Sequence, residues 1–295
     1  MKIKGTFTAL ITPFKNNEVD YEGFEKNVKF QIDNKINGLL PLGTTGETPT
    51  LNENEQTKII QIAVKAAENK IPVIVGTGSN STEHTIENTK RAKQEGADIA
   101  LIVTPYYNKP TQEGIYLHFK KVVETVDIPV IVYNIKGRTG TNIETPTLEK
   151  IADLPNIIGV KEASGDIMQM GDVINRIKSK HPDFSVMSGD DKITLPLLAL
   201  GGDGVISVIS NLVPAHMGRM VEAGLKGNFE KARKIHYELL PLIKAAFIET
   251  NPVPIKAAME MCGKSAGGVR LPLCQLKPES KEYLEKILKD MGLLS

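Results

Sequence analysis

Short runs of apolar residues alternate along the chain with longer segments in which apolar residues recur every third or fourth position. This alternation is typical of repeated β-α units around a parallel sheet. The runs are continuously apolar, so we expect both faces of the sheet to be covered. Eight runs predict strands, at residues 6–12, 38–42, 72–75, 99–104, 129–133, 157–161, 184–187 and 204–207.

Helices are predicted between these strands, and the segment after the second strand has a clear start. Asn52 and Glu55 have the spacing of a capping box. Eight β-α units favour a closed barrel over an open sheet. A dinucleotide-binding sheet is disfavoured, because Gly76-Thr77-Gly78 is followed by Ser81 where that fingerprint needs glycine.

Three further helical patterns follow the eighth unit, at residues 229–249, 254–261 and 279–291. A chain of 295 residues, 41% of them hydrophobic, is long enough for one barrel and such an extension. The sequence therefore predicts an α/β protein with a (β/α)8 TIM barrel over residues 1–225. A C-terminal helical extension, packed on the barrel, is predicted over residues 226–295.

The charge balance gives no reason to expect a polyanionic partner. The chain has 36 Lys and Arg and 35 Asp and Glu, so no global field would collect nucleic acid or an anionic membrane. No apolar stretch is long enough to cross a bilayer, and residues 1–14 lack the cleavage site of a signal peptide. Cys262 and Cys274 are too few and too far apart for a disulfide framework. We expect a small-molecule partner and a cytoplasmic location.

The candidate site residues are the polar residues that directly follow the apolar runs. A barrel of this kind carries its site at the C-terminal ends of its strands. The residues at those ends are Thr44, Thr45, Tyr106, Tyr107, Tyr133, Asn134, Lys161, Glu162, Gly189, Asp190 and Asp191.

Lys161 directly ends the apolar run 157–160 and can point into the barrel mouth. Schiff-base formation with a keto acid needs a neutral amine. Burial would lower the lysine pKa toward 7, a shift that corresponds to roughly 4 kcal/mol of free energy. Tyr133 ends the preceding strand, about 4.8 Å away, and its phenol can shuttle protons to the amine. Position alone leaves open a surface or ion-paired lysine, and a tyrosine that only packs at its strand end.

Two further features suit carboxylate binding. Residues 43–47 (GTTGE) offer backbone N–H groups and two hydroxyls in a turn, and Arg138 is a planar donor that can clamp a second carboxylate. Each has an ordinary alternative, a common glycine-rich turn and a surface arginine.

No metal site is predicted. Asp190 and Asp191 follow a strand and open a helix, where an N-cap is commoner than a divalent-ion site. The five histidines show no HExxH or HxxxH spacing.

Together these motifs resemble the family of pyruvate-dependent lyases that contains dihydrodipicolinate synthase and N-acetylneuraminate lyase. The resemblance covers essentially the whole chain. It is carried by residues 43–47 (GTTGE), 104–110 (TPYYNKP), 133–138 (YNIKGR), 160–162 (VKE) and 201–207 (GGDGVIS).

The resemblance implies an activity on two small molecules. Pyruvate would form a Schiff base on Lys161, lose a proton to become an enamine, and attack the aldehyde of L-aspartate 4-semialdehyde. Cyclisation would give 4-hydroxy-tetrahydrodipicolinate, on the route to lysine and diaminopimelate. No metal or organic cofactor is implied, and the assembly implied is a homotetramer, a dimer of dimers.

The resemblance also assigns a proton relay to three residues. Tyr133, Thr44 and Tyr107 match it, with Tyr107 expected to reach the site of a neighbouring subunit.

Four more residues match the family's substrate contacts. Thr45 matches the pyruvate-carboxylate site and Arg138 the clamp on the semialdehyde carboxylate, while Gly189 and the backbone carbonyl of Ile206 match positions lining the pocket. Sialic acid lyases generally lack an arginine at the place of Arg138, so this cation favours a short acidic aldehyde over a polyol.

One departure from the family pattern lies beside Arg138. Lys136 replaces a proline, which removes a fixed φ from this loop and adds a charge. We expect a raised KM for the semialdehyde.

A second departure concerns the interface pocket that many family members use for feedback by lysine. Asn80 and Tyr106 match its pattern, but Glu53, Gln56 and His84 replace the aromatic or histidine and the acidic residue usual there. We expect weak or absent lysine inhibition.

Three alternatives stay open from the sequence. One is a sister aldolase that uses the same Lys161 imine on a 2-keto-3-deoxy sugar acid or N-acetylneuraminate. Another is a metal- or phosphate-dependent barrel that uses Asp190, Asp191 and the turn at 201–204. The third is a non-catalytic barrel that binds a keto acid without turnover.

Overall fold

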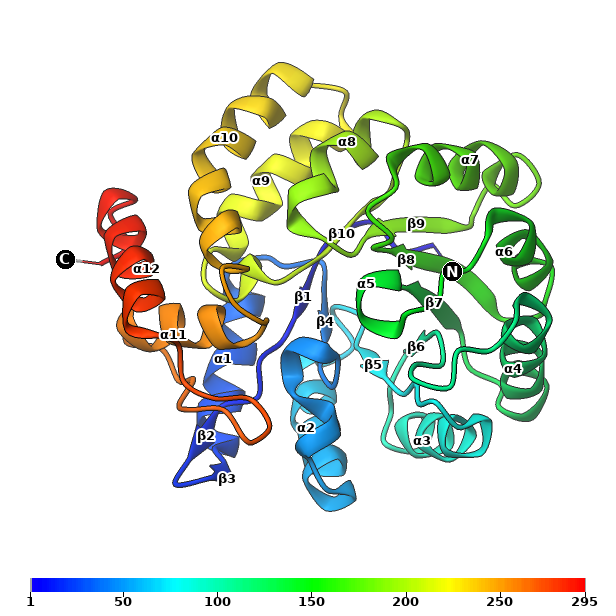
Figure 1. Cartoon of the computed structure of the whole chain (residues 1–295), viewed down its shortest axis with the longest axis horizontal. Helices are drawn as coiled ribbons and strands as arrows, with labels where there is room; N and C mark the ends of the chain where they lie inside the picture. The colour runs from blue at the N-terminus through cyan, green and yellow to red at the C-terminus, as the bar shows by residue number, and fades with distance from the viewer. Residues whose placement is uncertain (1, 295) are drawn as a thin grey trace.

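Eight parallel strands form the centre of the molecule in the computed structural model, which describes residues 2–294 (Figure 1). Their order around the sheet is β4-β1-β10-β9-β8-β7-β6-β5, and the two ends meet where Leu39 pairs with Val73. The predicted barrel is confirmed, and each of the eight apolar runs contributes one strand. The bounds are β1 Gly5–Ala9, β4 Gly38–Leu40, β5 Ile74–Gly76, β6 Ile99–Val103, β7 Val130–Asn134, β8 Ile157–Glu162, β9 Ser185–Ser188 and β10 Gly204–Ser207.

Helices surround the strands, as the periodicity predicted (Figure 1). Asn52 and Glu55 form the predicted capping box at the start of α2, each accepting a hydrogen bond from the backbone N–H of the other. The helices are α1 Tyr21–Asp33, α2 Glu53–Ala67, α3 Thr82–Gln94, α4 Gln112–Thr125, α5 Lys136–Thr139, α6 Thr145–Ala152, α7 Ile167–Lys178, α8 Thr194–Ala199, α9 Pro214–Leu225, α10 Phe229–Ala245, α11 Val253–Met261 and α12 Pro278–Asp290.

Several short elements were not predicted. A two-residue hairpin, β2 Phe14–Lys15 with β3 Glu18–Val19, precedes α1, and four short 3-10 helices follow strand ends or loops. Elements this short carry no readable period in the sequence. The 3-10 helices are η1 Thr44–Gly46, η2 Thr48–Thr50, η3 Asp191–Ile193 and η4 Ile209–Asn211.

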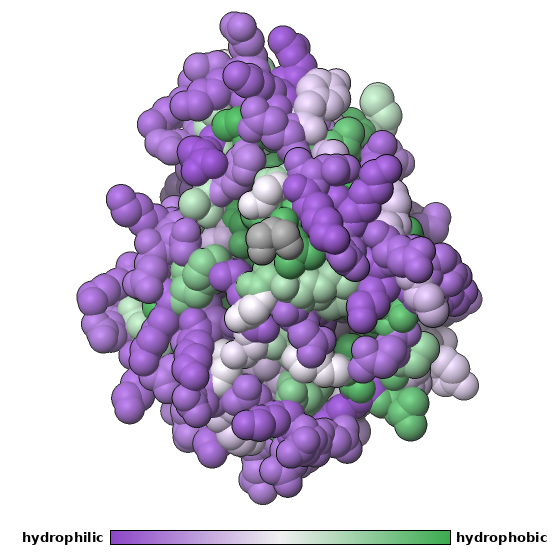
Figure 2. All heavy atoms as spheres, turned by 90° about the vertical axis from the view of Figure 1, so that its left-hand side faces the viewer, coloured by the Kyte–Doolittle hydropathy of each residue, from purple (hydrophilic) through white to green (hydrophobic). Residues whose placement is uncertain are grey.

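The C-terminal helices lie on one side of the barrel (Figure 1). They share a hydrophobic core with α9 and with strand β10, in which Leu239, Ile255 and Leu284 pack with Met217 and Val205. The three predicted helices are found there, while the division into units 1–225 and 226–295 stays a prediction. The face that carries α12 is mostly hydrophilic, with apolar side chains in separate patches (Figure 2).

The barrel interior is filled by side chains from the strands, including Phe7, Leu101, Met187 and Tyr133. Such filling leaves the chemistry to the strand ends. Within residues 2–294, no helix combines the length and the apolar character that crossing a bilayer requires.

Candidate active site

The parallel pairing of β7 with β8 brings Tyr133 and Lys161 side by side. The two residues are register partners, and Lys161 Nζ lies 4.1 Å from the centroid of the Tyr133 ring. The structure therefore brings together the two residues that the sequence placed on neighbouring strand ends.

Lys161 is buried without a counter-charge in contact. The residue is 6% exposed. Within residues 2–294, its amine has no hydrogen-bond or ion-pair partner. Burial lowers the pKa of Lys161 to about 7; the carboxylate of Asp191 opposes this shift and the Arg138 charge adds to it. Because the charged form is disfavoured, a substantial fraction of the amine is neutral near pH 7.

Gly189 leaves the space that the Lys161 side chain occupies. A Cβ at position 189 would lie 2.8 Å from Cβ of Ala163 and 3.1 Å from Cγ of Lys161. The contact with Ala163 is shorter than real Cβ atoms allow, and the contact with Lys161 is tighter than most, so a larger residue would press on both side chains. This is a steric reason for glycine at a position that the sequence assigned to the substrate pocket.

The acidic pair after β9 is held by backbone amides. Asp190 caps η3 by accepting from the N–H of Lys192 at 2.9 Å, which confirms the N-cap interpretation. Asp191 accepts from the N–H groups of Val208 and Ile209 at 2.9 and 3.2 Å, and burial raises its pKa to about 6. Across residues 2–294, no three His, Cys, Asp or Glu side chains are grouped as metal ligands.

The phenol of Tyr133 is kept protonated by its surroundings. Burial raises the pKa of Tyr133, and the nearby Arg138 charge and a side-chain hydrogen bond with Thr44 offset only part of that rise. A neutral phenol beside an amine is able to donate and receive a proton in turn.

A cavity of about 440 Å³ opens above these residues, and it is lined by Thr44, Tyr133, Tyr106, Arg138 and Asn251 among others. Lys161 is not among the lining residues, but its Nζ lies 4.1 Å from the ring centroid of Tyr133, which is. Tyr133 therefore contacts both the cavity and the buried amine.

Arg138 lies on the one-turn helix α5, whose first residue is Lys136. The arginine is exposed at the cavity rim, and its Nη2 donates to the backbone carbonyl of Asn251 at 3.3 Å. Its guanidinium therefore stays at the opening, where an incoming anion would meet it.

Tyr107 does not join Tyr133 and Thr44, the other residues assigned to the relay, within the same chain. It is 89% exposed, has a positive φ of 75°, and does not line the cavity. A bulky residue in this conformation is a genuine backbone outlier, of the kind that clusters at functional sites.

Thr45 and Ile206 are both buried. The Thr45 hydroxyl accepts from Nδ2 of Asn251 at 3.0 Å, and Ile206 on β10 pairs with Phe7 on β1. Neither lines the cavity directly, so the predicted contacts of Thr45 and of the Ile206 carbonyl with substrate stay predictions.

Two of the five residues assigned to a regulatory pocket, Gln56 and Tyr106, line this same cavity. Arg91 occupies the neighbourhood, because its Nη2 donates to Oε1 of Gln56 at 2.8 Å and its Nη1 lies 3.5 Å from Glu53.

The two remaining regulatory candidates, His84 and Asn80, do not line the cavity. His84 is exposed at the start of α3, and Asn80 uses its backbone carbonyl to accept from Asn108 at 2.8 Å.

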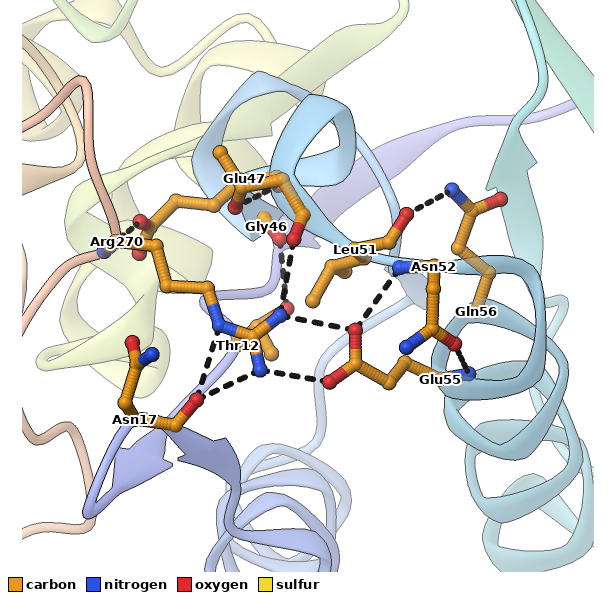
Figure 3. A network of polar contacts seen from close by, with 10 residues as sticks. Thr12, Asn17, Gly46, Glu47, Leu51, Asn52, Glu55, Gln56 and Arg270 are labelled. Carbon is orange, nitrogen blue, oxygen red and sulfur yellow. Dashed lines mark hydrogen bonds and ion pairs between the residues drawn. The ribbon is translucent and has the colours of Figure 1, made fainter.

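The sequence did not predict a buried ion-pair network behind the GTTGE turn. Figure 3 shows the part of this network around Glu47, Glu55 and Arg270. Glu47, 1% exposed at the side chain, accepts from Nζ of Lys256 at 2.7 Å and from the backbone N–H of Arg270 at 3.1 Å. Arg270 in turn pairs with Glu55 on α2 at 2.6 Å. The network fixes the turn that carries Thr44 and Thr45 against the C-terminal part of the chain.

No local signal in the sequence marks Lys256, Arg270 or Asn251. Each lies more than 200 residues away from its partner in the turn or in α2, and none follows a barrel strand. Only the folded chain brings them to the site.

Comparison with known proteins agrees with this geometry. The model of the family described as "Dihydrodipicolinate synthetase family" matches residues 2–291 of this chain. A curated 4-hydroxy-tetrahydrodipicolinate synthase from Protochlamydia amoebophila (strain UWE25) is 55% identical over 99% of this chain and 97% of its own length.

Two solved structures are similar over nearly their whole length. A dihydrodipicolinate synthase from Thermotoga maritima has 47% identity and a TM-score of 0.98, with 100% of both chains covered. A structure titled as the first monomeric dihydrodipicolinate synthase variant has 47% identity and a TM-score of 0.97, with 99% of this chain and 98% of the other covered.

Proposed function

Because the chain belongs to the dihydrodipicolinate synthetase family, we propose that it condenses pyruvate with L-aspartate 4-semialdehyde to give 4-hydroxy-tetrahydrodipicolinate. The observation that carries this proposal is a buried lysine, Lys161, whose amine has no counter-charge in contact and lies against a tyrosine. The product is a step toward lysine and diaminopimelate.

The neutral Lys161 amine attacks the keto carbon of pyruvate, and loss of water leaves an iminium. Removal of a methyl proton gives an enamine, whose carbon forms the new bond to the aldehyde carbon of the semialdehyde. Attack of the substrate's own amino group on the iminium carbon then closes the ring and releases the lysine amine. The positive charge that the iminium carries makes the methyl proton acidic, which is the reason for forming it.

The protons of these steps pass through Tyr133 and Thr44. The raised pKa of the Tyr133 phenol favours its neutral form, so the phenol carries a proton at the start of the cycle and takes one back after giving it up. Tyr107 completes the relay from a neighbouring subunit, which agrees with its exposed position outside its own cavity.

The two substrate carboxylates use different donors. The Thr45 hydroxyl and the backbone of its turn receive pyruvate, and Arg138 at the rim receives the semialdehyde. Gly189 and the Ile206 carbonyl border the substrate next to Lys161.

The functional assembly is a homotetramer built as a dimer of dimers, in the cytoplasm. The 89% exposure of Tyr107, outside the cavity of its own chain, supports an assembly, and the free thiols of Cys262 and Cys274 suit a reducing compartment. Light scattering gives the subunit number. Mixing the Lys161→Ala and Tyr107→Phe chains tests the shared site, since activity should reappear on mixing and its continued absence would contradict it.

Turnover assays separate this function from its alternatives. Pyruvate with the semialdehyde should be converted far faster than a 2-keto-3-deoxy sugar acid or N-acetylneuraminate is cleaved. EDTA should leave the rate unchanged, since no metal or organic cofactor takes part. Preferred cleavage of a sugar acid, loss of activity with EDTA, or pyruvate binding without turnover would each overturn the proposal.

Lysine should inhibit weakly or not at all. The Arg91 guanidinium donates to Gln56 and Asn88 and lies next to Glu53. It therefore pairs with the Glu53 carboxylate, which would otherwise attract a lysine ammonium. Steady-state assays with added lysine test this, and half-inhibition below a millimolar concentration would contradict it.

A further inference from the structure

Asn251 contacts both residues to which the proposed function assigns a substrate carboxylate, Thr45 and Arg138. It lies between α10 and α11, is 5% exposed and lines the cavity. Its side-chain Nδ2 donates to the Thr45 hydroxyl at 3.0 Å, and its backbone carbonyl accepts from Arg138 at 3.3 Å. One residue from the C-terminal part of the chain therefore joins two elements of the barrel mouth.

The direction of the first hydrogen bond decides what Thr45 can do. A hydroxyl has one hydrogen to donate, and it can accept from a second group at the same time. Because Asn251 is the donor, the Thr45 hydrogen stays free for another acceptor. A carboxylate has only acceptors, so this is the arrangement that pyruvate needs.

The other end of the same amide is left without a partner. Within residues 2–294, Oδ1 of Asn251 is buried and accepts no hydrogen bond. A buried unpaired carbonyl costs free energy, and such exceptions in folded proteins call for an explanation outside stability. The amide is held in this orientation although its oxygen remains unsatisfied.

We propose that Asn251 is a positioning residue for both substrates, which turns the Thr45 hydroxyl toward the pyruvate carboxylate with its amide and holds Arg138 with its carbonyl. This inference rests on the proposed function. It assigns to the side chain a role in pyruvate binding and to the main chain a role in binding the semialdehyde. The two roles are separable, because a substitution removes only the first.

Asn251→Ala tests the side-chain role. Without the amide, the Thr45 hydroxyl is free to rotate away, and the pyruvate concentration for half-maximal rate should rise by about 3- to 10-fold. The KM for the semialdehyde should stay within about 2-fold of the wild-type value, since the Asn251 carbonyl is untouched. The pH profile of the reaction should keep its shape, since Lys161 is untouched. Asn251→Asp should raise the pyruvate requirement further, because the new carboxylate accepts the Thr45 hydrogen and repels the substrate.

A double-mutant cycle shows whether the effect passes through Thr45. In a Thr45→Val background, the hydroxyl that Asn251 orients is already gone. Asn251→Ala should therefore leave the pyruvate concentration for half-maximal rate unchanged in that background. An equal rise in both backgrounds would overturn the inference. Asn27 offers a matched control, as it is also 5% exposed and donates through Nδ2 to a backbone carbonyl, that of Ser265. Asn27→Ala should leave the pyruvate requirement unchanged.

Reductive trapping separates this inference from the proposed function. Borohydride added at graded pyruvate concentrations should fix the adduct on Lys161 in both wild type and Asn251→Ala, with half-trapping at higher pyruvate in the variant. Equal half-trapping concentrations would overturn the role of Asn251 while leaving the Schiff base intact. No adduct in the wild type would overturn the function itself.

Discussion

Two lysines are buried within residues 2–294, and they are held in opposite ways. Lys161 at the end of β8 and Lys256 on α11 are 6% and 1% exposed, and their amines lie 4.1 and 4.2 Å from the rings of Tyr133 and Phe14. Lys256, however, pairs with Glu47 at 2.7 Å and donates to the carbonyl of Thr12 at 2.8 Å, while Lys161 has neither contact.

The difference teaches that burial alone does not make an amine reactive. Burial lowers the pKa of Lys256 to about 8 although Glu47 raises it, so at pH 7 this amine stays charged. Burial lowers the pKa of Lys161 to about 7, and the Asp191 carboxylate, which forms no ion pair with the amine, opposes this shift. A paired amine holds the fold together, and an unpaired one beside a cavity is available to a keto acid.

The largest expected effect is on catalysis. Lys161→Ala removes the nucleophile, so kcat should fall by at least about 10³-fold, since no other group can form the imine. Initial rates with both substrates measure this. Full turnover in the variant would show that the reaction does not use this amine.

The next effect is on stability, and its sign should differ between the two lysines. Lys256→Met leaves the carboxylate of Glu47 buried and unpaired, so the free energy of unfolding should fall by about 3–5 kcal/mol. Adding Glu47→Gln should recover part of that loss.

Lys161→Met should act in the opposite direction. The native state resists protonation of Lys161, so its cost to folding grows as pH falls from the ordinary pKa of 10.5 to about 7 and is constant below. Removing the amine should therefore stabilise the protein at pH 7 by roughly 2–4 kcal/mol, and less near pH 10. Urea unfolding of both Met variants checks the two signs, and losses of similar size would remove the distinction.

A third effect concerns the pH dependence of adduct formation. Below about pH 7 the rate at low pyruvate should rise about tenfold per pH unit, and above it the rate should level, because the Lys161 amine is then neutral. Stopped-flow mixing with pyruvate over a pH series measures this. A rate that continues to rise through about pH 9 would mean that the amine titrates like an exposed lysine.

The smallest effect lies at the rim of the cavity above Lys161. Lys136 is the first residue of α5, a position where proline is favoured because its φ is already helical. Lys136→Pro should hold Arg138 more firmly and lower the KM for the semialdehyde by about 2- to 5-fold, with the Lys256 network unaffected. An unchanged KM would show that the loop is already fixed, by contacts such as the one with the Asn251 carbonyl.

The contrast between the two lysines also marks what the sequence could predict. Lys161 and Tyr133 were found because each ends a continuous apolar run, and parallel strands bring such ends together at one edge. The same rule drew attention to Asp190, which caps η3 as expected.

The rest depends on contacts between distant segments. Lys256, Arg270 and Asn251 lie in helices and loops after the barrel, where nothing local separates a buried polar residue from a solvated one. Glu47 was read only as part of a turn, because its partners follow it by more than 200 residues. The position of Tyr107 outside its own cavity likewise depends on a backbone conformation that no period predicts.

The most direct test compares the two lysines in one experiment. The protein is incubated with pyruvate, reduced with borohydride, digested, and mapped by mass spectrometry. We expect a reduced pyruvyl adduct on the peptide that contains Lys161 and none on the peptide that contains Lys256. An adduct on Lys256, or no adduct on Lys161, would contradict it.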